Sequence, residues 1–140
     1  MQKILLILDD TERGKTAFKK LLELAEDGLR GEVSILYIRE MEIPPFVSEE
    51  KELSSYHRLI SHTMEKLEKY KQELENAGFT VSDVKVSFGK YADRVLILEK
   101  EMHPDLIVVG MKRSISGLFR KDPCEVLLKR SRSNLLICRD

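Results

Sequence analysis

Two spacings of hydrophobic residues alternate along the 140 residues of the chain. Short apolar runs, some continuous and some alternating with polar residues, predict five strands at residues 3–8, 32–38, 79–88, 106–109 and 135–138. Apolar residues that recur every three or four positions predict four helices at residues 11–27, 53–77, 92–102 and 123–130. Strands that alternate with helices and read as apolar runs indicate a parallel sheet covered on both faces. The pattern therefore predicts a doubly wound α/β fold.

The two longer helical patterns predict part of the core. Within residues 11–27, one face carries apolar side chains and Gly28 marks the end of the helix. These side chains are Ala17, Phe18, Leu21, Leu22 and Ala25. The second helix follows Pro44-Pro45 and ends before Gly78, with one apolar stripe that we expect to be buried. The stripe consists of Leu53, Tyr56, Ile60, Met64, Leu67, Tyr70, Leu74 and Ala77.

Length and charge limit the classes of function. The chain is long enough for one domain with a substantial core, and its composition does not change along its length, so we expect a single domain over residues 1–140. The 24 basic and 24 acidic residues cancel, which gives no reason to expect binding to nucleic acid or to an anionic membrane. Any partner must therefore recognise a local feature.

The first apolar run and the cysteines indicate a cytoplasmic protein. The run Ile4–Leu8 is interrupted by Asp9-Asp10 and is too short for a signal peptide or a membrane-spanning helix. Cys124 and Cys138 have no metal-ligand spacing and cannot form a disulfide framework, which is typical of a reducing compartment. We therefore expect a cytoplasmic protein without a metal site.

The ends of the predicted strands locate a ligand crevice. In doubly wound sheets, ligands bind beyond the carboxyl ends of the strands, at the point where the strand order reverses. Asp9, Ile38 and Gly110 each end a predicted strand or follow one directly. We expect these three residues to face one crevice.

Three segments of the chain resemble the universal stress protein family. They are KILLILDDTERGKTAFKKLLELA, FGKYADRVLILEKEMHPDLIVVG and LLKRSRSNLLICR, and the most specific piece runs from Pro104 to Gly110. The resemblance covers the length of the chain. It implies a five-stranded sheet of order 3-2-1-4-5 and, in most members, a homodimer. It also implies a family in which some members bind ATP and others do not.

The loop after the fourth strand bears on whether ATP binding is retained. The ATP-binding members carry Gly-x-x-Gly and, about nine residues later, Gly followed by Ser or Thr, because glycines let backbone amides approach the phosphates. Gly110 matches the first glycine, whereas Arg113 stands at the second. Lys121 and Asp122 align with the Gly-Ser pair when the loop is shortened by two residues. The glycine cradle is therefore degraded.

Two interpretations of this loop remain open. Asp122 is expected to be the N-cap of a helix that begins with Pro123, so that its carboxylate takes amide hydrogen bonds otherwise offered to a phosphate. Glu125 adds negative charge in the first turn. Four cations can instead bind phosphate without glycines, and these are Lys112, Arg113, Arg120 and Lys121. We expect no cofactor, and ATP remains the alternative.

Asp9 and Ile38 also have two interpretations each. By the resemblance, Asp9 corresponds to an Asp that contacts the nucleoside part of ATP, but it is equally suited to capping the turn that follows. Ile38 occupies the position whose backbone meets the adenine, and it also fits a core residue. Three scattered histidines are expected at the surface rather than in catalysis, and these are His57, His62 and His103.

No catalytic motif is recognisable in the sequence. It contains neither a nucleophile elbow nor a Walker loop, and DDTERGK follows the first strand where a pyrophosphatase-type loop would stand. Cys124 is either a reactive thiol of low pKa at a helix amino terminus or a small packed residue. We predict a non-enzymatic regulatory or stress-response module, and the alternative is an ATP-dependent switch or weak ATPase.

The last strand predicts the mode of assembly. In the implied strand order it lies at an edge of the sheet, and no Pro or Lys interrupts its apolar run. Pairing with a second copy across a two-fold axis covers such an edge. We therefore expect a homodimer through the last strand, formed by Leu135, Leu136, Ile137 and Cys138.

Overall fold

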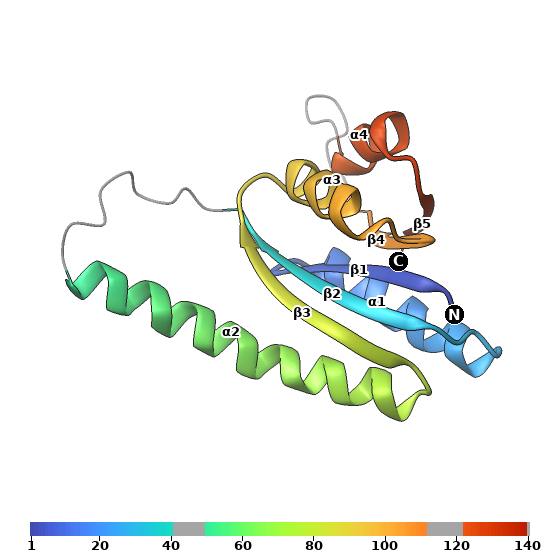
Figure 1. Cartoon of the computed structure of the whole chain (residues 1–140), viewed down its shortest axis with the longest axis horizontal. Coiled ribbons are helices and arrows are strands. Elements are labelled where there is room, and N and C mark those ends of the chain that lie inside the picture. Colours follow the sequence, from blue (N-terminus) through green and yellow to red (C-terminus); the bar gives the residue numbers. More distant parts are fainter. Residues whose placement is uncertain (41–49, 112–121, 140) are drawn as a thin grey trace.

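The computed structural model describes residues 1–40, 50–111 and 122–139, with the backbone alone for residues 50–56 (Figure 1). Its strands are β1 (Lys3–Asp9), β2 (Glu32–Arg39), β3 (Thr80–Phe88), β4 (Leu106–Gly110) and β5 (Asn134–Cys138). Its helices are α1 (Glu12–Glu26), α2 (Glu50–Asn76), α3 (Tyr91–Met102) and α4 (Pro123–Arg130). These nine elements are the nine that the sequence predicts, with ends that differ by a few residues at most.

The five strands form one parallel sheet in the order β3-β2-β1-β4-β5, which confirms the predicted fold. β1 lies at the centre of the sheet. The chain adds β2 and β3 on one side of β1 and then crosses over to add β4 and β5 on the other side, so the strand order reverses at β1. In register, Asp9 at the end of β1 lies opposite Ile38, and Gly110 at the end of β4 lies opposite Cys138. The carboxyl ends of the strands therefore meet at one edge of the sheet.

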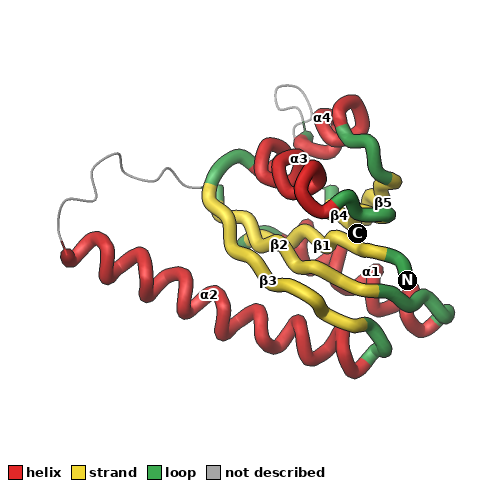
Figure 2. Tube along the Cα trace, viewed as in Figure 1, coloured by secondary structure: helices red, strands yellow, loops and turns green. Residues whose placement is uncertain are grey.

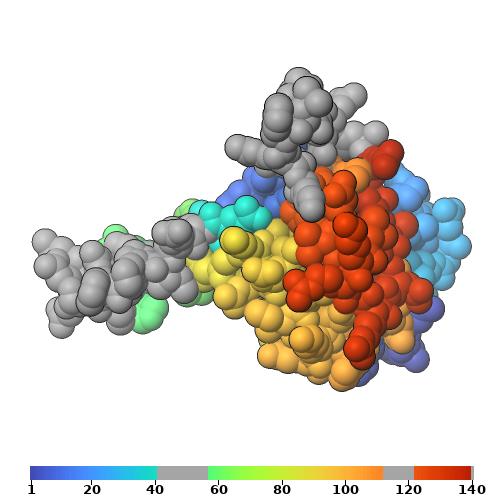
Figure 3. Space-filling view, turned by 90° about the horizontal axis from the view of Figure 1, so that it is seen from above, coloured from blue at the N-terminus to red at the C-terminus, as the bar shows by residue number. Residues whose placement is uncertain are grey.

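Helices cover both faces of the sheet (Figure 2). Alternate residues of β1 point to opposite faces. Thus Ile4, Leu6 and Leu8 pack with α1 and α2, whereas Leu5 and Ile7 pack with α3 and α4. All five side chains are buried, as expected for a central parallel strand. Figure 3 shows α3, in yellow and orange, beside the red α4 on one side of the molecule.

Among the side chains that the structure describes, the predicted buried stripe of α2 is correct except at Met64. Leu67 and Leu74 are buried, and Ile60, Tyr70 and Ala77 are half-buried, as predicted. The prediction for Met64 is wrong, because its side chain is 39% exposed. Thr63 is buried instead. Its hydroxyl donates a hydrogen bond to the Leu59 carbonyl at 2.8 Å, which removes the cost of burying a polar atom at that position. Leu53 and Tyr56 are among the residues described by backbone alone.

Local signals set the helix ends. Gly28 follows α1 with φ of +105°, a conformation that favours glycine, and confirms the predicted stop.

In the part of the chain that the structure describes, no helix combines the length and the apolar character needed to cross a membrane.

Candidate functional site

The candidate site lies at the carboxyl edge of the sheet, where β1 and β4 end and α1 and α4 begin. Four side chains meet there and form what we call the crevice cluster: Asp9, Arg13, Glu40 and Tyr91. They come from the end of β1, the first turn of α1, the residue after β2 and the first residue of α3. A strand-order reversal is the place where ligands bind in open α/β sheets. Here the chain's own side chains occupy that place.

Asp9 is fully engaged by groups of its own chain. One carboxylate oxygen accepts hydrogen bonds from the Thr11 amide at 3.0 Å and the Thr11 hydroxyl at 2.7 Å. The other oxygen accepts from Arg13 Nε at 2.5 Å. The side chain is only 5% exposed. Asp9 therefore caps the turn between β1 and α1, which is one of the two roles that the sequence left open.

Arg13 is a buried cation held on three sides. Besides Asp9, its Nη2 atom lies 3.6 Å from Glu40 Oε1, and its guanidinium lies 3.9 Å from the centre of the Tyr91 ring. Burial works against the charged form, but the attraction of Asp9, then of Tyr91 and Glu40, outweighs it and raises the pKa of Arg13. The cation is thus stable in a site from which water is largely excluded.

Glu40 links the cluster to α3. Its Oε1 atom accepts a hydrogen bond from the Tyr91 amide at 3.2 Å, at the amino terminus of α3 where a backbone amide has no partner within the helix. The same atom faces Arg13. One exposed carboxylate therefore connects the ends of β2, α1 and α3.

Gly110 allows α1 to approach the sheet closely. A Cβ atom at this position would lie 1.8 Å from the Arg13 carbonyl oxygen, which is backbone and cannot move aside cheaply. Gly110 is also buried. In this structure the glycine is required for packing against the first turn of α1, whatever the crevice binds.

The start of α4 confirms the predicted N-cap. The Asp122 carboxylate accepts a hydrogen bond from the Cys124 amide at 2.8 Å, and Pro123 is the first residue of the helix. Cys124 is buried, and its thiol donates a hydrogen bond to the Gly110 carbonyl at 3.7 Å. Burial, followed by the interaction with Asp122, raises the pKa of Cys124 to about 12. This thiol is protonated at neutral pH, so the structure favours the packed role over the reactive one.

Tyr91 contributes a buried hydroxyl to the site. Its oxygen has no hydrogen-bond partner among the described residues. Burial is the largest cause of a raised pKa for Tyr91, which Arg13 offsets only in part. Neither Tyr91 nor Cys124 is therefore activated as a nucleophile or a base.

The structure brings together four of the seven predicted site residues. Asp9 and Gly110 end adjacent strands, and Asp122 is the N-cap of α4. Ile38 lies opposite Asp9 and is 1% exposed, in the core. The predicted cations Lys112, Arg113 and Lys121 lie outside the described residues, as does Arg120. Their contribution to the crevice stays a prediction.

Sequence reasoning missed Arg13, Glu40 and Tyr91. For Arg13 a signal existed, because it continues the apolar stripe of α1 in steps of four, ahead of Ala17 and Leu21. A charged residue in that register, four residues after Asp9, indicates a buried ion pair. Glu40 carries no comparable local signal, because its partners lie in other elements.

Order and connectivity of the strands place the protein among doubly wound α/β domains. Comparison with protein families gives a match to the universal stress protein family over residues 1–139. The chain belongs to this family. A separate comparison with curated proteins finds no significant match.

Solved structures share the fold. The hypothetical protein MJ0577 is 23% identical with a TM-score of 0.78, and the match covers 99% of this chain and 96% of that one. UspA from Lactobacillus plantarum is 16% identical with a TM-score of 0.76, covering 99% and 97%. A universal stress protein family protein from Arabidopsis thaliana, with AMP bound, is 12% identical with a TM-score of 0.69, covering 99% and 92%.

Proposed function

We propose that this universal stress protein is a non-enzymatic regulatory or stress-response module that binds ATP weakly or not at all. The observation that carries the proposal is the state of Asp9. Both of its carboxylate oxygens already accept hydrogen bonds from Thr11 and Arg13. A nucleoside that used Asp9 would compete with Thr11 and Arg13 for its oxygens, and displacing Arg13 would leave a cation in a site that is almost closed to water.

The start of α4 supports the same proposal. A phosphate at a helix amino terminus is held by free backbone amides. Here Asp122 takes the Cys124 amide, and Pro123 has no amide hydrogen to give. Glu125 adds a second negative charge in the first turn of the helix. An incoming phosphate thus meets fewer donors and more repulsion than at an uncapped helix.

The alternative function is an ATP-binding switch or weak ATPase. It is favoured by the related structure from Arabidopsis thaliana, which contains AMP, and by the four cations predicted in the loop before α4. The raised pKa values of Cys124 and Tyr91 argue against catalysis by either side chain. Binding without turnover is therefore the stronger form of this alternative.

Calorimetric titration with ATP and magnesium tests the proposal. We expect no binding in the low micromolar range, which corresponds to about 8 kcal/mol. The double substitution Lys121→Gly and Asp122→Ser should improve binding, because it restores free amides and removes the capping carboxylate. Lys85→Gly with Asp83→Ser makes the same two changes at exposed positions of β3, at the opposite edge of the sheet, and serves as the control. A low micromolar dissociation constant for the unmodified protein contradicts the proposal.

Mass spectrometry offers a second test that needs no choice of ligand. The protein is purified without added nucleotide and then denatured, and the released small molecules are identified. We expect no stoichiometric adenine nucleotide. Release of AMP or ATP at one equivalent per chain would support the alternative function.

We also propose that the module is a homodimer through β5. The strand lies at an edge of the sheet, and Leu135, Leu136 and Ile137 are only half-buried within one chain. Cys138 is buried already and contributes less to an interface. Ile137→Lys should dissociate the dimer in light scattering by placing two like charges near the axis, whereas Thr80→Lys at the opposite edge should not. A monomer at micromolar concentration for the unmodified protein contradicts this assembly.

A further inference from the structure

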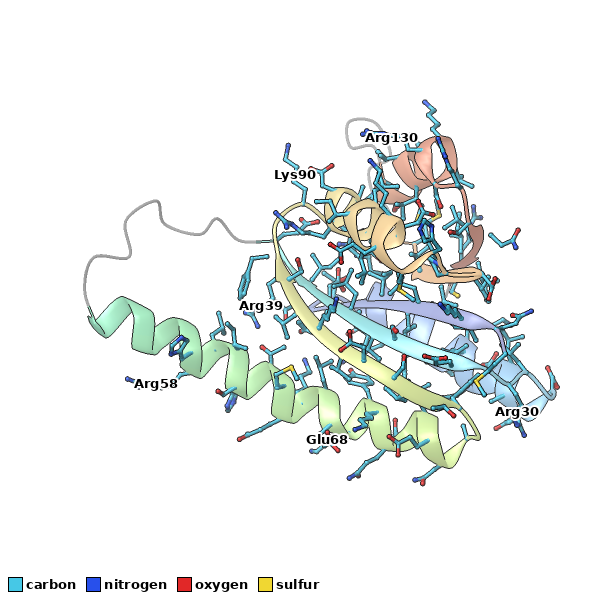
Figure 4. The ribbon with its side chains drawn as sticks, in the orientation of Figure 1. Arg30, Arg39, Arg58, Glu68, Lys90 and Arg130 are labelled. Atoms are coloured by element: carbon cyan, nitrogen blue, oxygen red, sulfur yellow. The ribbon has the colours of Figure 1, made fainter. Side chains whose placement is uncertain are left out.

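A second concave site lies on the other face of the sheet, between α2 and the carboxyl ends of β1 and β2. We call it the α2 groove. It has a volume of about 450 Å³, within the range of pockets that hold small molecules. Its lining consists of Asp10, Tyr37, Arg39, Leu59, His62, Thr63, Glu65, Lys66 and Lys69. In Figure 4, Arg39 lies on the side of β2 that faces α2.

Two periodicities bring these residues together. In β2, Val33, Ile35 and Tyr37 point to the face that carries α1 and α2, and Arg39 follows in the same alternation. In α2, Leu59, His62, Lys66 and Lys69 recur every three or four positions, and Thr63 and Glu65 lie next to them, so the lining residues share one side of the helix. The groove is therefore built by regular elements.

Arg39 is held much less completely than a paired arginine. Its Nη1 atom lies 3.5 Å from the Thr63 hydroxyl, and its Nη2 atom lies 3.6 Å from an Asp10 carboxylate oxygen. Both distances are long for a hydrogen bond that involves a charged donor. Its Nε atom is buried and has no acceptor among the described residues. A buried donor without a partner is costly, and an added acceptor relieves that cost.

Cations are in excess around the groove. Arg39, Lys66 and Lys69 give three positive charges, against the two carboxylates of Asp10 and Glu65. Asp10 is also engaged by the Tyr37 hydroxyl, which donates a short hydrogen bond to it. The Lys66 ammonium lies 5.7 Å from the centre of the Tyr37 ring, at the wall of the groove. The site thus has both charge and donors for an oxyanion.

We propose that the α2 groove binds a small organic molecule that carries a phosphate or carboxylate group. The Arg39 side chain is 25% exposed, and its guanidinium can present two N–H donors to two oxygens of the ligand. Lys66 and Lys69 supply further positive charge, and Leu59 supplies an apolar surface for the rest of the molecule. The groove lies on the opposite face of the sheet from the core that packs against Tyr91, so this proposal does not depend on whether the crevice binds ATP.

Amide chemical shifts in a ¹⁵N spectrum test the proposal with three probes of similar shape. Phenyl phosphate and benzoate carry the two candidate oxyanions, and benzyl alcohol is the neutral control. We expect saturable shifts at residues 37–40 and 59–69 with at least one of the two anions at low ionic strength. Equal affinity for benzyl alcohol, or shifts that never saturate, would overturn the proposal.

Substitutions identify the residues that hold the anion. Arg39→Gln should weaken binding by about tenfold, and Lys66→Gln by about threefold, because each removes a charged donor. Lys71→Gln makes the same change on α2 outside the groove and should alter the affinity by less than twofold. Asp10→Asn should tighten binding, because it removes a carboxylate that competes for Arg39. If Lys66→Gln and Lys71→Gln have equal effects, the groove is not the binding site, and this comparison holds even if Arg39→Gln is unstable.

Discussion

Arg13 and Arg39 lie near the same edge of the sheet, yet their surroundings differ. Arg13 is 5% exposed, pairs with Asp9 at 2.5 Å and stacks on Tyr91. Arg39 is 25% exposed, and its contacts are 3.5 and 3.6 Å long. The first arginine is enclosed and makes one short hydrogen bond to a buried carboxylate, whereas the second makes only long contacts and has a buried Nε donor without an acceptor among the described residues. The comparison shows that the same side chain is part of the packed core in one place and available for binding in another.

The difference has a cause in the packing of the helices. Gly14 and Gly110 let the first turn of α1 approach β1 and β4 so closely that the Arg13 side chain is enclosed. On the other side, α2 approaches β2 through Thr63 and leaves an open groove beside Arg39. The close contacts at Gly14 and Gly110 leave no space around Arg13, whereas the packing of α2 against β2 leaves a groove beside Arg39.

Of the substitutions that test this comparison, Gly110→Ala should cause the largest loss of stability. The added Cβ would meet the Arg13 carbonyl at 1.8 Å, so α1 must move away from β4 or the protein must unfold. We expect a loss of more than about 4 kcal/mol in the free energy of unfolding, measured with urea. Gly28→Ala is the control, because nothing lies within 4 Å of its Cβ, and only backbone strain of about 1–2 kcal/mol is expected. A loss below 1 kcal/mol for Gly110→Ala would show that the close approach is wrong.

Arg13→Ala should destabilise the protein more than Arg39→Ala. Removing the Arg13 cation leaves Asp9 as a buried carboxylate without its countercharge, and we expect a cost of about 3 kcal/mol. Arg39 faces a half-exposed Asp10, so its removal should cost less than about 1 kcal/mol. Urea unfolding of the two variants measures the difference. Equal losses would contradict the distinction between the two arginines.

Glu99 is a third charged side chain held by its own chain, on the face of the sheet that carries α3 and α4, and its contribution to stability depends on pH. This buried carboxylate accepts hydrogen bonds from the Ser131 hydroxyl and from the amides of Arg132 and Ser133 at 3.2 and 3.1 Å. Burial alone raises its pKa, but the hydrogen bonds from Ser131, Ser133 and Arg132 outweigh burial, and the pKa of Glu99 is lowered from its ordinary value of 4.5. The ionised form is therefore the one that the fold stabilises.

Glu99→Gln should reveal this contribution through its pH dependence. Because the pKa is lower in the folded state, the stabilisation is fully present above about pH 4.5 and is lost as the pH falls through the folded value. We expect the variant to be about 1–2 kcal/mol less stable at pH 7 and the gap to shrink below pH 4.5. Urea unfolding of both proteins from pH 7 to pH 3.5 measures it. A constant gap would show that charge is not the cause.

Substitutions of two tyrosines should have the smallest effects on stability, and the two effects should differ in sign or size. The Tyr91 hydroxyl is buried without a partner among the described residues, so Tyr91→Phe should be neutral or stabilising by up to about 1 kcal/mol. The Tyr37 hydroxyl donates to Asp10, so Tyr37→Phe should cost about 1 kcal/mol. Thermal unfolding compares them. Destabilisation by Tyr91→Phe would indicate that its hydroxyl has a partner in solution.

Local sequence patterns were sufficient to predict the fold class and the positions of several residues at the carboxyl edge of the sheet. Apolar spacing gave the nine elements, because a strand and a helix bury side chains with different periods. The Asp122-Pro123 pair predicted the start of α4, because capping depends on neighbouring residues alone. Asp9 and Gly110 were placed together because the carboxyl ends of adjacent parallel strands must share an edge.

The partners of the charged residues could be identified only from the packed structure. Arg13 reaches Tyr91 and Glu40 across gaps of 78 and 27 residues in sequence, and Arg39 faces Thr63 on another element. Thr63 rather than Met64 is buried, and its hydroxyl donates to the Leu59 carbonyl, so that burial leaves no unpaired polar atom there. These outcomes depend on the distance between packed helices and the sheet. Local sequence sets which residues form an element, and the packing of elements sets which charges become buried partners and which stay open to a ligand.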